Sequence, residues 1–165
     1  MHAFHTIVVA VDFSETSTDT IEMAVELARD QPHRIHLLHV VADVHRTLGV
    51  TEAPGVDWAE VQRGLIDQGR TRLVELASAC RLDPRQVTIA VETGTAVAGI
   101  LRYADEHDAQ MLVLGSHGHG IVRRFMLGSV AERVLRLARC PVVLVPHRLL
   151  RLTTFEVKAA SGVES

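Results

Sequence analysis

The sequence predicts an α/β protein with one open, parallel five-stranded sheet and helices on both of its faces. Five short apolar runs alternate along the chain with four segments of helical periodicity, an order typical of repeated βαβ units. The first run, TIVVAV at residues 6–11, is rich in β-branched residues and shows no polar alternation, as expected for a strand that is buried on both faces. The chain has 165 residues, 47% of them hydrophobic and 22% charged, which predicts one soluble domain.

The first strand is predicted at residues 6–11, which read TIVVAV. Asp12 ends this strand, and Ser14 is the expected N-cap of a helix over residues 14–29. The helix carries four apolar residues at the spacing i, i+3, i+4 and i+7, which predicts one buried stripe: Ile21, Ala24, Val25 and Ala28.

The second strand is predicted at residues 34–41. Its two histidines, His36 and His39, are three positions apart, so they face opposite sides of the sheet and are not expected to share a metal ion. A loop is predicted at residues 42–56, which contain two glycines and a proline. A helix follows at residues 58–80, with one apolar face made of Leu73, Leu76, Ala77 and Cys80.

The remaining elements complete the alternation. The third strand is predicted at residues 87–91, the fourth at 111–114 and the fifth at 142–145, and a helix is predicted at 128–138. The helix between the third and fourth strands is marked by Val97, Ile100, Leu101 and Ala104. In a sheet of order 3-2-1-4-5, the exits of the first and fourth strands are neighbours at the point where the winding reverses, which is where such sheets bind ligands.

Charge and termini exclude several classes of protein. The formal net charge is −3, which argues against a dedicated nucleic-acid binder or a protein that binds anionic membranes. No apolar run approaches the roughly 20 residues that span a bilayer. Residues 1–5 lack the basic and apolar stretches of a signal peptide, so a cytoplasmic location is expected. We expect the domain to cover residues 1–146, with residues 147–165 as a C-terminal appendage.

Residue usage excludes further chemistry. The single lysine is Lys158, in the C-terminal appendage, so the body of the chain holds no P-loop or Schiff-base lysine. The two cysteines, Cys80 and Cys140, form no CxxC pair, and neither a zinc site nor a disulfide framework is expected. No GxSxG elbow is present, which argues against a hydrolase.

The most informative segment is the glycine-rich stretch that follows the fourth strand. It reads GSHGHG at residues 115–120 and continues to Gly128 and Ser129, where the next helix is predicted to begin. Glycines in such a loop permit positive φ and let phosphate oxygens approach the main chain, while the helix N-terminus favours an anion. Arg123 and Arg124 could screen phosphate charge or point into water. The alternative is a plain turn, which four glycines in 14 residues make less favoured.

This stretch resembles a known family. The spacing of Gly115, Gly118 and the pair Gly128-Ser129 matches, without a gap, the G-2x-G-9x-G(S/T) motif of ATP-binding universal stress protein (UspA-like) domains. Three further stretches resemble the opening and closing segments of that family: residues 7–14, 127–135 and 140–146. The resemblance covers residues 4–146 and implies a Rossmann-like sheet of order 3-2-1-4-5.

The resemblance also implies a binding site for ATP or another adenine nucleotide. Asp12 and Val11 would meet the adenosine, with Asp12 near the ribose or near a Mg²⁺ or Mn²⁺ ion held by the nucleotide. Either Val40 or Val41 would flank the adenine. The residues expected at the nucleotide are Val11, Asp12, Val40, Val41, Leu114, Gly115, His117, Gly118, Gly128, Ser129 and Val130.

Several alternatives stay open at this point. Asp12 could be a helix-capping acid, and His117 could be a solvated loop residue instead of a phosphate contact. The resemblance implies a homodimer through the fifth strand, Val142–Val145, although the C-terminal appendage could cover that edge instead. A nucleotide-responsive regulatory module is favoured over a slow ATPase, a self-phosphorylating enzyme or a ligand-free interaction domain, because phosphoryl transfer needs positioned cations that this chain supplies sparsely.

Overall fold

The computed structural model describes residues 5–29, 32–44, 55–117 and 127–146, and its single sheet confirms the predicted fold class. Five parallel strands are arranged in the order β3-β2-β1-β4-β5. The strands are β1 His5–Ala10, β2 His33–Val41, β3 Val87–Thr93, β4 Met111–Gly115 and β5 Val142–Val145. The helices are α1 Ser17–Leu27, α3 Trp58–Ala79, α4 Ala96–Glu106 and α5 Ser129–Leu137.

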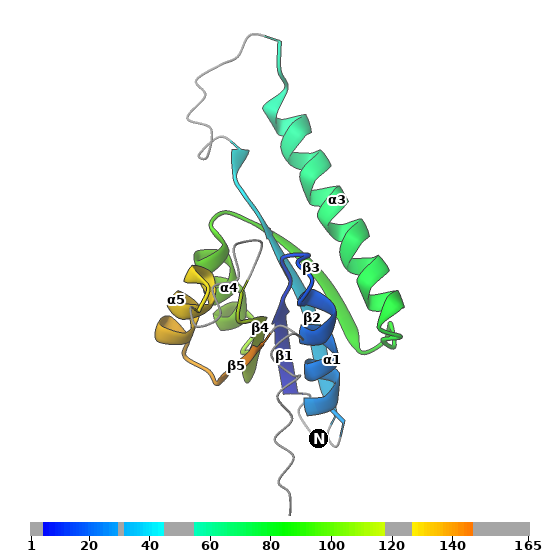
Figure 1. The fold of residues 1–165 in the computed structure, drawn as a ribbon. Helices are drawn as coiled ribbons and strands as arrows, with labels where there is room; N and C mark the ends of the chain where they lie inside the picture. Colours follow the sequence, from blue (N-terminus) through cyan, green and yellow to red (C-terminus); the bar gives the residue numbers. More distant parts are fainter. Residues whose placement is uncertain (1–4, 30–31, 45–54, 118–126, 147–165) are drawn as a thin grey trace, which may run out of the picture.

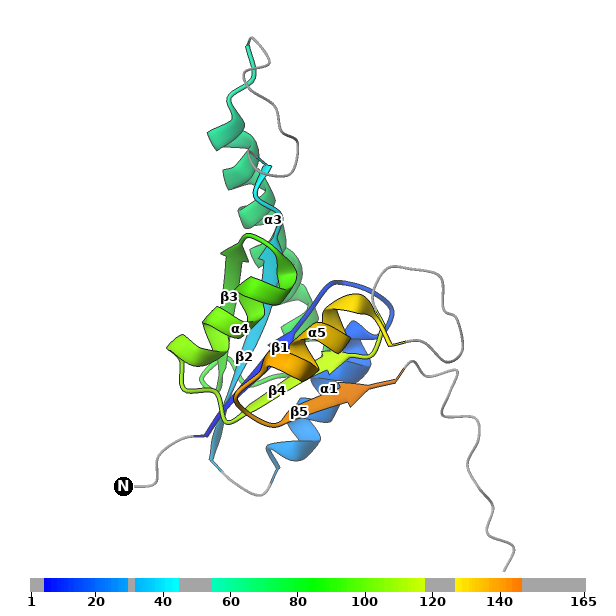
Figure 2. The same cartoon turned by 90° about the vertical axis from the view of Figure 1, so that its left-hand side faces the viewer.

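The helices form two layers, one on each face of the sheet. Helices α1 and α3 lie on one face and α4 and α5 on the other (Figure 1). Figure 2 shows α4 and α5 in front of the strands. The chain winds outward from β1 through β2 to β3 and then returns to place β4 on the other side of β1. The winding therefore reverses between β1 and β4, and the helices that follow these two strands lie on opposite faces of the sheet.

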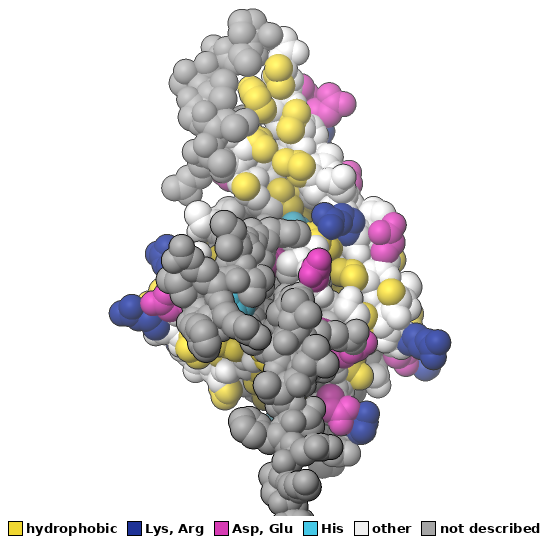
Figure 3. Space-filling view, viewed as in Figure 1, with side chains coloured by type: hydrophobic (Ala, Val, Ile, Leu, Met, Phe, Trp, Pro, Cys, Tyr) yellow, Lys and Arg dark blue, Asp and Glu magenta, His cyan; other side chains and the backbone are white. Residues whose placement is uncertain are grey.

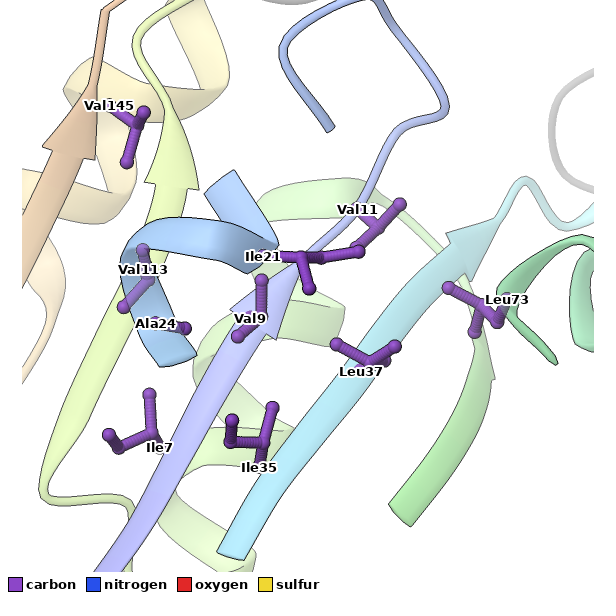
Figure 4. Close-up of a cluster of buried hydrophobic side chains, with 10 residues drawn as sticks. All are labelled: Ile7, Val9, Val11, Ile21, Ala24, Ile35, Leu37, Leu73, Val113 and Val145. Atoms are coloured by element: carbon purple, nitrogen blue, oxygen red, sulfur yellow. The ribbon is translucent and has the colours of Figure 1, made fainter. Parts of the chain in front are cut away.

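Each face of the sheet has its own hydrophobic core, as continuous apolar strands require. On the α1 and α3 face, Ile7 and Val9 of β1 pack with residues from both helices of that face and from the neighbouring strands (Figure 4). These residues are Val11, Ile21, Ala24, Ile35, Leu37, Leu73, Val113 and Val145. On the other face, Val8 packs with Leu38, Ile100, Tyr103, Ala104, Leu112, Leu114, Ala131 and Val134. Because successive side chains of a strand point to opposite faces of the sheet, neighbouring strand residues lie in opposite cores.

The two histidines of β2 point to opposite faces, as predicted. His36 is buried on the α4 face, where its Nδ1 lies 3.0 Å from the Tyr103 hydroxyl. Burial lowers the pKa of His36 below its usual value. His39 lies on the α3 face, against Phe13. Within the described residues, no group of three or more His, Cys, Asp or Glu side chains is placed to hold a metal ion.

The first helix begins later than predicted. Its N-cap is Thr16 and not Ser14, because the Ser14 amide donates to the Asp12 carboxylate at 2.9 Å in a turn that precedes the helix. Val25 was expected in the buried stripe, yet its exposed fraction is 37%. The helix meets the sheet through Ile21 and Ala24, both fully buried, and a residue one position beyond Ala24 lies at the edge of that contact.

Helix α3 extends well past the sheet. Its buried residues are Gly69 and Leu73, both in its C-terminal half, and the N-terminal half rises beyond the strands (Figure 1). Apolar side chains gather over this projecting part (Figure 3), where Val61 and Leu65 are exposed. Even so, no helix in the described part of the chain is both long and apolar enough to cross a membrane. Cys80, at the end of α3, and Cys140 are both free thiols.

Two helical glycines differ in what surrounds them, which gives a matched test of the packing between α4 and the sheet. A Cβ at Gly99 would lie 2.9 Å from both methyl carbons of Val40, whereas a Cβ at Gly64 of α3 would meet nothing within 4 Å. Gly64→Ala is expected to stabilise the protein by about 0.5–1 kcal/mol through helix propensity. Gly99→Ala is expected to destabilise it by roughly 1–3 kcal/mol through overpacking. Urea unfolding of both variants measures the difference, and shifts of the same sign would contradict it.

Candidate functional site

A cavity of about 490 Å³ opens where the sheet reverses its winding. It lies at the carboxyl ends of β1, β2 and β4 and is bordered by the first turns of α1, α4 and α5. Its lining is made of Ala10, Val11, Asp12, Thr16, Ser17, Thr20, Leu38, His39, Val40, Ala96, Ile100, Leu114, Gly115, His117, Leu127, Gly128, Ser129, Val130 and Ala131. Strand order and strand direction together create this opening, as in other open parallel sheets.

Most of the residues predicted from sequence to contact a nucleotide lie around this cavity. They are Val11, Asp12, Val40, Leu114, Gly115, His117, Gly128, Ser129 and Val130. Val41 does not line it: the residue is buried, and its Cγ2 lies 3.7 Å from the point where a Cβ of Gly69 would be, so it packs toward α3. Of the two alternatives for the adenine contact, Val40 is therefore the one beside the cavity. Gly118, Arg123 and Arg124 lie outside the described residues.

Gly115 is required for space and not for positive φ. A Cβ at this position would lie 2.6 Å from the Thr16 hydroxyl oxygen and 3.2 Å from the carbonyl oxygen of His117. Gly128 has a φ of −62°, which any residue adopts. The expectation that the glycines provide left-handed backbone is thus wrong for these two residues. Glycine at 115 instead lets the end of β4 approach the start of α1 closely.

Asp12 lies at the mouth of the cavity in an exposed turn and is not the N-cap of α1. Its Oδ1 accepts hydrogen bonds from the Ser14 amide at 2.9 Å and from the Ser17 hydroxyl at 3.4 Å. Both contacts come from the residues that lead into α1, so they orient one carboxylate oxygen toward the protein. An ionised carboxylate has only acceptor sites, so Asp12 contributes acceptors at the cavity.

The three helices that begin at the cavity have no side-chain caps. At the N-termini of α1, α4 and α5, the N-cap residues Thr16, Thr95 and Gly128 make no side-chain hydrogen bond to the first-turn amides. Helix α3 begins elsewhere and is capped: Asp57 accepts from the amides of Ala59 and Glu60. Uncapped first-turn amides carry a partial positive charge and need acceptors. The cavity is therefore bordered by donors that an anion can satisfy.

His117 adds a ring nitrogen to this border. Its Nδ1 lies 2.9 Å from the Ser116 hydroxyl, and its Nε2 is buried without a hydrogen-bond partner among the described residues. Buried polar atoms in native proteins are nearly always hydrogen-bonded, so an unpartnered one beside a cavity indicates room for a ligand atom. Its backbone oxygen accepts from the Thr16 hydroxyl at 3.4 Å, which ties the start of the glycine-rich stretch to α1.

The cavity thus has three chemically different parts. The floor beside β2 and α4 is apolar and includes Val40, Ala96 and Ile100. The middle, at the end of β1, carries the Asp12 carboxylate, and the side at α5 presents amide and hydroxyl donors around Ser129. A ligand that matches this order has a flat apolar part, then hydroxyl donors, then an anionic group.

Several lining residues were not predicted from the sequence. Thr16, Ser17 and Thr20 lie in the first turns of α1 and are buried beside the cavity. The sequence did contain a sign of these residues, because hydroxyl side chains that directly follow the end of a strand are unusual on a buried helix face. Ala96 and Ile100 of α4 carried no such signal, because only the strand order brings α4 next to β1 and β2.

Comparisons with known proteins agree with this fold. The family model described as the universal stress protein family matches residues 3–146. Universal stress protein YxiE of Bacillus subtilis is 28% identical over 146 residues, covering 86% of this chain and 99% of that protein. The solved UspA from Lactobacillus plantarum superposes with a TM-score of 0.71 at 21% identity, covering 88% of this chain and 99% of that one.

A third relative was solved with a ligand. The universal stress protein from Archaeoglobus fulgidus, in complex with dAMP, superposes with a TM-score of 0.60 at 24% identity. The match covers 86% of this chain and 97% of that one. At this identity the likeness shows the shared fold, whereas the family model covers nearly all of the residues before the appendage. The chain belongs to the universal stress protein family.

Proposed function

We propose that this protein binds an adenine nucleotide, ATP in the first place, in the cavity between β1 and β4 and acts as a nucleotide-responsive regulatory module in the stress response. The observation that carries the proposal is the set of uncapped helix N-termini around the cavity, together with the unpartnered Nε2 of His117. These groups call for an anion, and Gly115, Gly128 and Ser129 of the glycine motif line the same cavity.

The order of chemical groups along the cavity indicates which way round the nucleotide would bind. The base would lie on the apolar floor beside Val40, and the sugar hydroxyls would donate to Asp12. The phosphates would lie at the first turn of α5, where Ser129 adds a hydroxyl donor and His117 its Nε2. In the reverse orientation the phosphates would lie on the apolar floor beside Val40, so that orientation is disfavoured.

Two further observations support a nucleotide of this kind. The relative from Archaeoglobus fulgidus was solved with dAMP, an adenine nucleotide. In addition, a Mg²⁺ or Mn²⁺ ion held by the nucleotide would approach Asp12, whose exposed carboxylate lines the cavity and offers the oxygen ligands that such ions prefer.

Regulation is favoured over efficient catalysis. Phosphoryl transfer needs positioned cations and a group that orients the nucleophile. Around the cavity, the described residues include no lysine or arginine, and His117 is the one polar group that could orient a nucleophile near the phosphate end. A cytoplasmic location and the boundary between a domain at 1–146 and an appendage at 147–165 remain predictions.

Nucleotide binding is testable through thermal stability. At a concentration one hundred times its dissociation constant, ATP is expected to stabilise the fold by about 2.7 kcal/mol, a rise in Tm of roughly 5–10 °C. Gly118→Val is expected to abolish the rise, because a β-branched side chain blocks close approach of phosphate. Asp12→Ala is expected to weaken ATP binding by roughly tenfold or more through loss of a charged acceptor. Differential scanning fluorimetry and isothermal titration calorimetry measure the two effects.

A matched control separates binding from general damage. Asp67→Ala removes an exposed carboxylate from α3, away from the cavity, and is expected to keep the full ATP response. If the wild-type protein shows no shift with ATP, ADP or AMP, a ligand-free interaction domain replaces the proposed function. Phosphate release that Asp12→Ala abolishes would identify a slow ATPase instead.

We also propose a homodimer through β5. The carbonyls of Pro141 and Val145 accept from the amides of Leu112 and Ser116, both at 2.9 Å, so these groups of β5 face β4. By the alternation of a strand, the amide groups of Val142 point to the free edge of the sheet. An apolar edge strand with free amide groups is a ready surface for pairing with a second copy.

The dimer is testable at that edge. Val142→Pro removes an amide hydrogen that faces outward while keeping the contacts of β5 with β4, so it is expected to convert a dimer into a monomer. Val142→Thr has the same shape and retains the amide, and it is expected to stay dimeric. Light scattering at tens of micromolar distinguishes the two states. A wild-type monomer at that concentration would contradict the dimer and favour an edge covered by the C-terminal appendage.

A further inference from the structure

The residue after Asp12 has an unusual backbone conformation. Phe13 has a φ of 62°, in the left-handed region that bulky side chains rarely adopt. The other two non-glycine residues with positive φ in the described structure are Arg81 and Asp108, and each directly follows the C-cap of a helix, where this conformation is common. Phe13 instead lies between a strand and a helix, so contacts outside the backbone must hold it there.

The ring of Phe13 is held between two side chains from other elements. The guanidinium carbon of Arg72, on α3, lies 3.9 Å from the ring centroid. The imidazole of His39, on β2, lies 4.4 Å from it, centroid to centroid. A cation over an aromatic face and a tilted pair of rings are both attractive arrangements. Three elements that are distant in the sequence therefore meet at this one aromatic ring.

His39 also anchors the residue before Asp12. Its Nδ1 lies 2.7 Å from the carbonyl oxygen of Val11, and because a carbonyl only accepts, Nδ1 is the donor. Burial lowers the pKa of His39 below its usual value, which favours the neutral ring. Gly69 of α3 lies over the imidazole: a Cβ there would be 3.2 Å from the His39 Cδ2. The ring is thus confined between α3 and the end of β1.

Asp12 stands between these two anchored neighbours. The Val11 carbonyl is held by His39, and the Phe13 ring is held by His39 and Arg72. We infer that Phe13, His39 and Arg72 form a positioning stack that holds the Asp12 carboxylate in place for the sugar hydroxyls of the nucleotide. The inference rests on the proposed function and adds to it three residues that act through Asp12, of which Phe13 and Arg72 do not line the cavity.

Three substitutions of Phe13 distinguish the effect of its aromatic ring on ATP binding from the effect of its strained backbone. Phe13→Tyr keeps the aromatic face and is expected to bind ATP like the wild type. Phe13→Ala removes the ring and is expected to weaken ATP binding by about 5- to 20-fold, within the range of coupling between residues in contact. Phe13→Gly also relaxes the positive φ. If backbone strain alone mattered, Phe13→Gly would bind normally, whereas a positioning ring predicts weak binding for both.

A double-mutant cycle tests whether the ring acts through Asp12. In an Asp12→Ala background, Phe13→Ala is expected to weaken ATP binding by less than twofold further. Arg72→Gln is a second test that does not depend on the folding of Phe13→Ala, because Arg72 is an exposed residue of α3 and its replacement leaves the fold intact. We expect Arg72→Gln to weaken ATP binding about threefold to fivefold. Arg70→Gln, two positions away and also exposed, is the matched control and is expected to bind normally.

Calorimetric titration with ATP, with the Tm of each ligand-free variant measured beside it, distinguishes the outcomes. If Asp12→Ala weakens binding while Phe13→Ala and Arg72→Gln do not, the positioning role is overturned and the proposed function stands. An equal effect of Phe13→Ala with and without Asp12 also overturns it, as does a lower Tm with unchanged affinity. Absence of ATP binding by the wild type would overturn the proposed function itself.

Discussion

The parallel pairing of β1 with β4 is the contact on which the rest of the molecule depends. Its register, from Ile7 opposite Met111 to Ala10 opposite Leu114, aligns the two strand ends at the same level of the sheet. The chain leaves β1 toward the α1 layer, and the α5 layer follows β4 on the opposite face. The helices that follow these two strands lie on opposite faces of the sheet, so in the described part of the chain the cavity follows from topology more than from any single side chain.

The polar chemistry of the cavity also follows from that geometry. Three helices start beside it, and at each of them the N-cap residue makes no side-chain cap hydrogen bond. An anion bound at such first-turn amides would also stabilise the folded state. The contrast with α3, which starts away from the cavity and is capped by Asp57, argues that the missing caps are a feature of the site and not of the chain in general.

The fold was largely predictable from the sequence, because the strands are mostly apolar and alternate with segments of helical period. Details that depend on three-dimensional contacts were not. Val25 follows the helical period of α1 yet is exposed, since the width of the contact with the sheet is set by packing. The choice between Val40 and Val41 required knowing which face of β2 borders the cavity. Likewise, the closeness of Gly115 to Thr16 depends on two elements that are a hundred residues apart in the chain.

The prolines that flank β5 have a consequence for the solubility of the folded protein. Pro141 and Pro146 stand immediately before and after the four residues of this edge strand. By the alternation of the strand, residue 146 is one of those whose backbone groups face the free edge, and its proline nitrogen carries no hydrogen. A ladder formed across this edge would therefore lose a donor directly after Val145. A short edge of this kind is a poor template for extended cross-β growth.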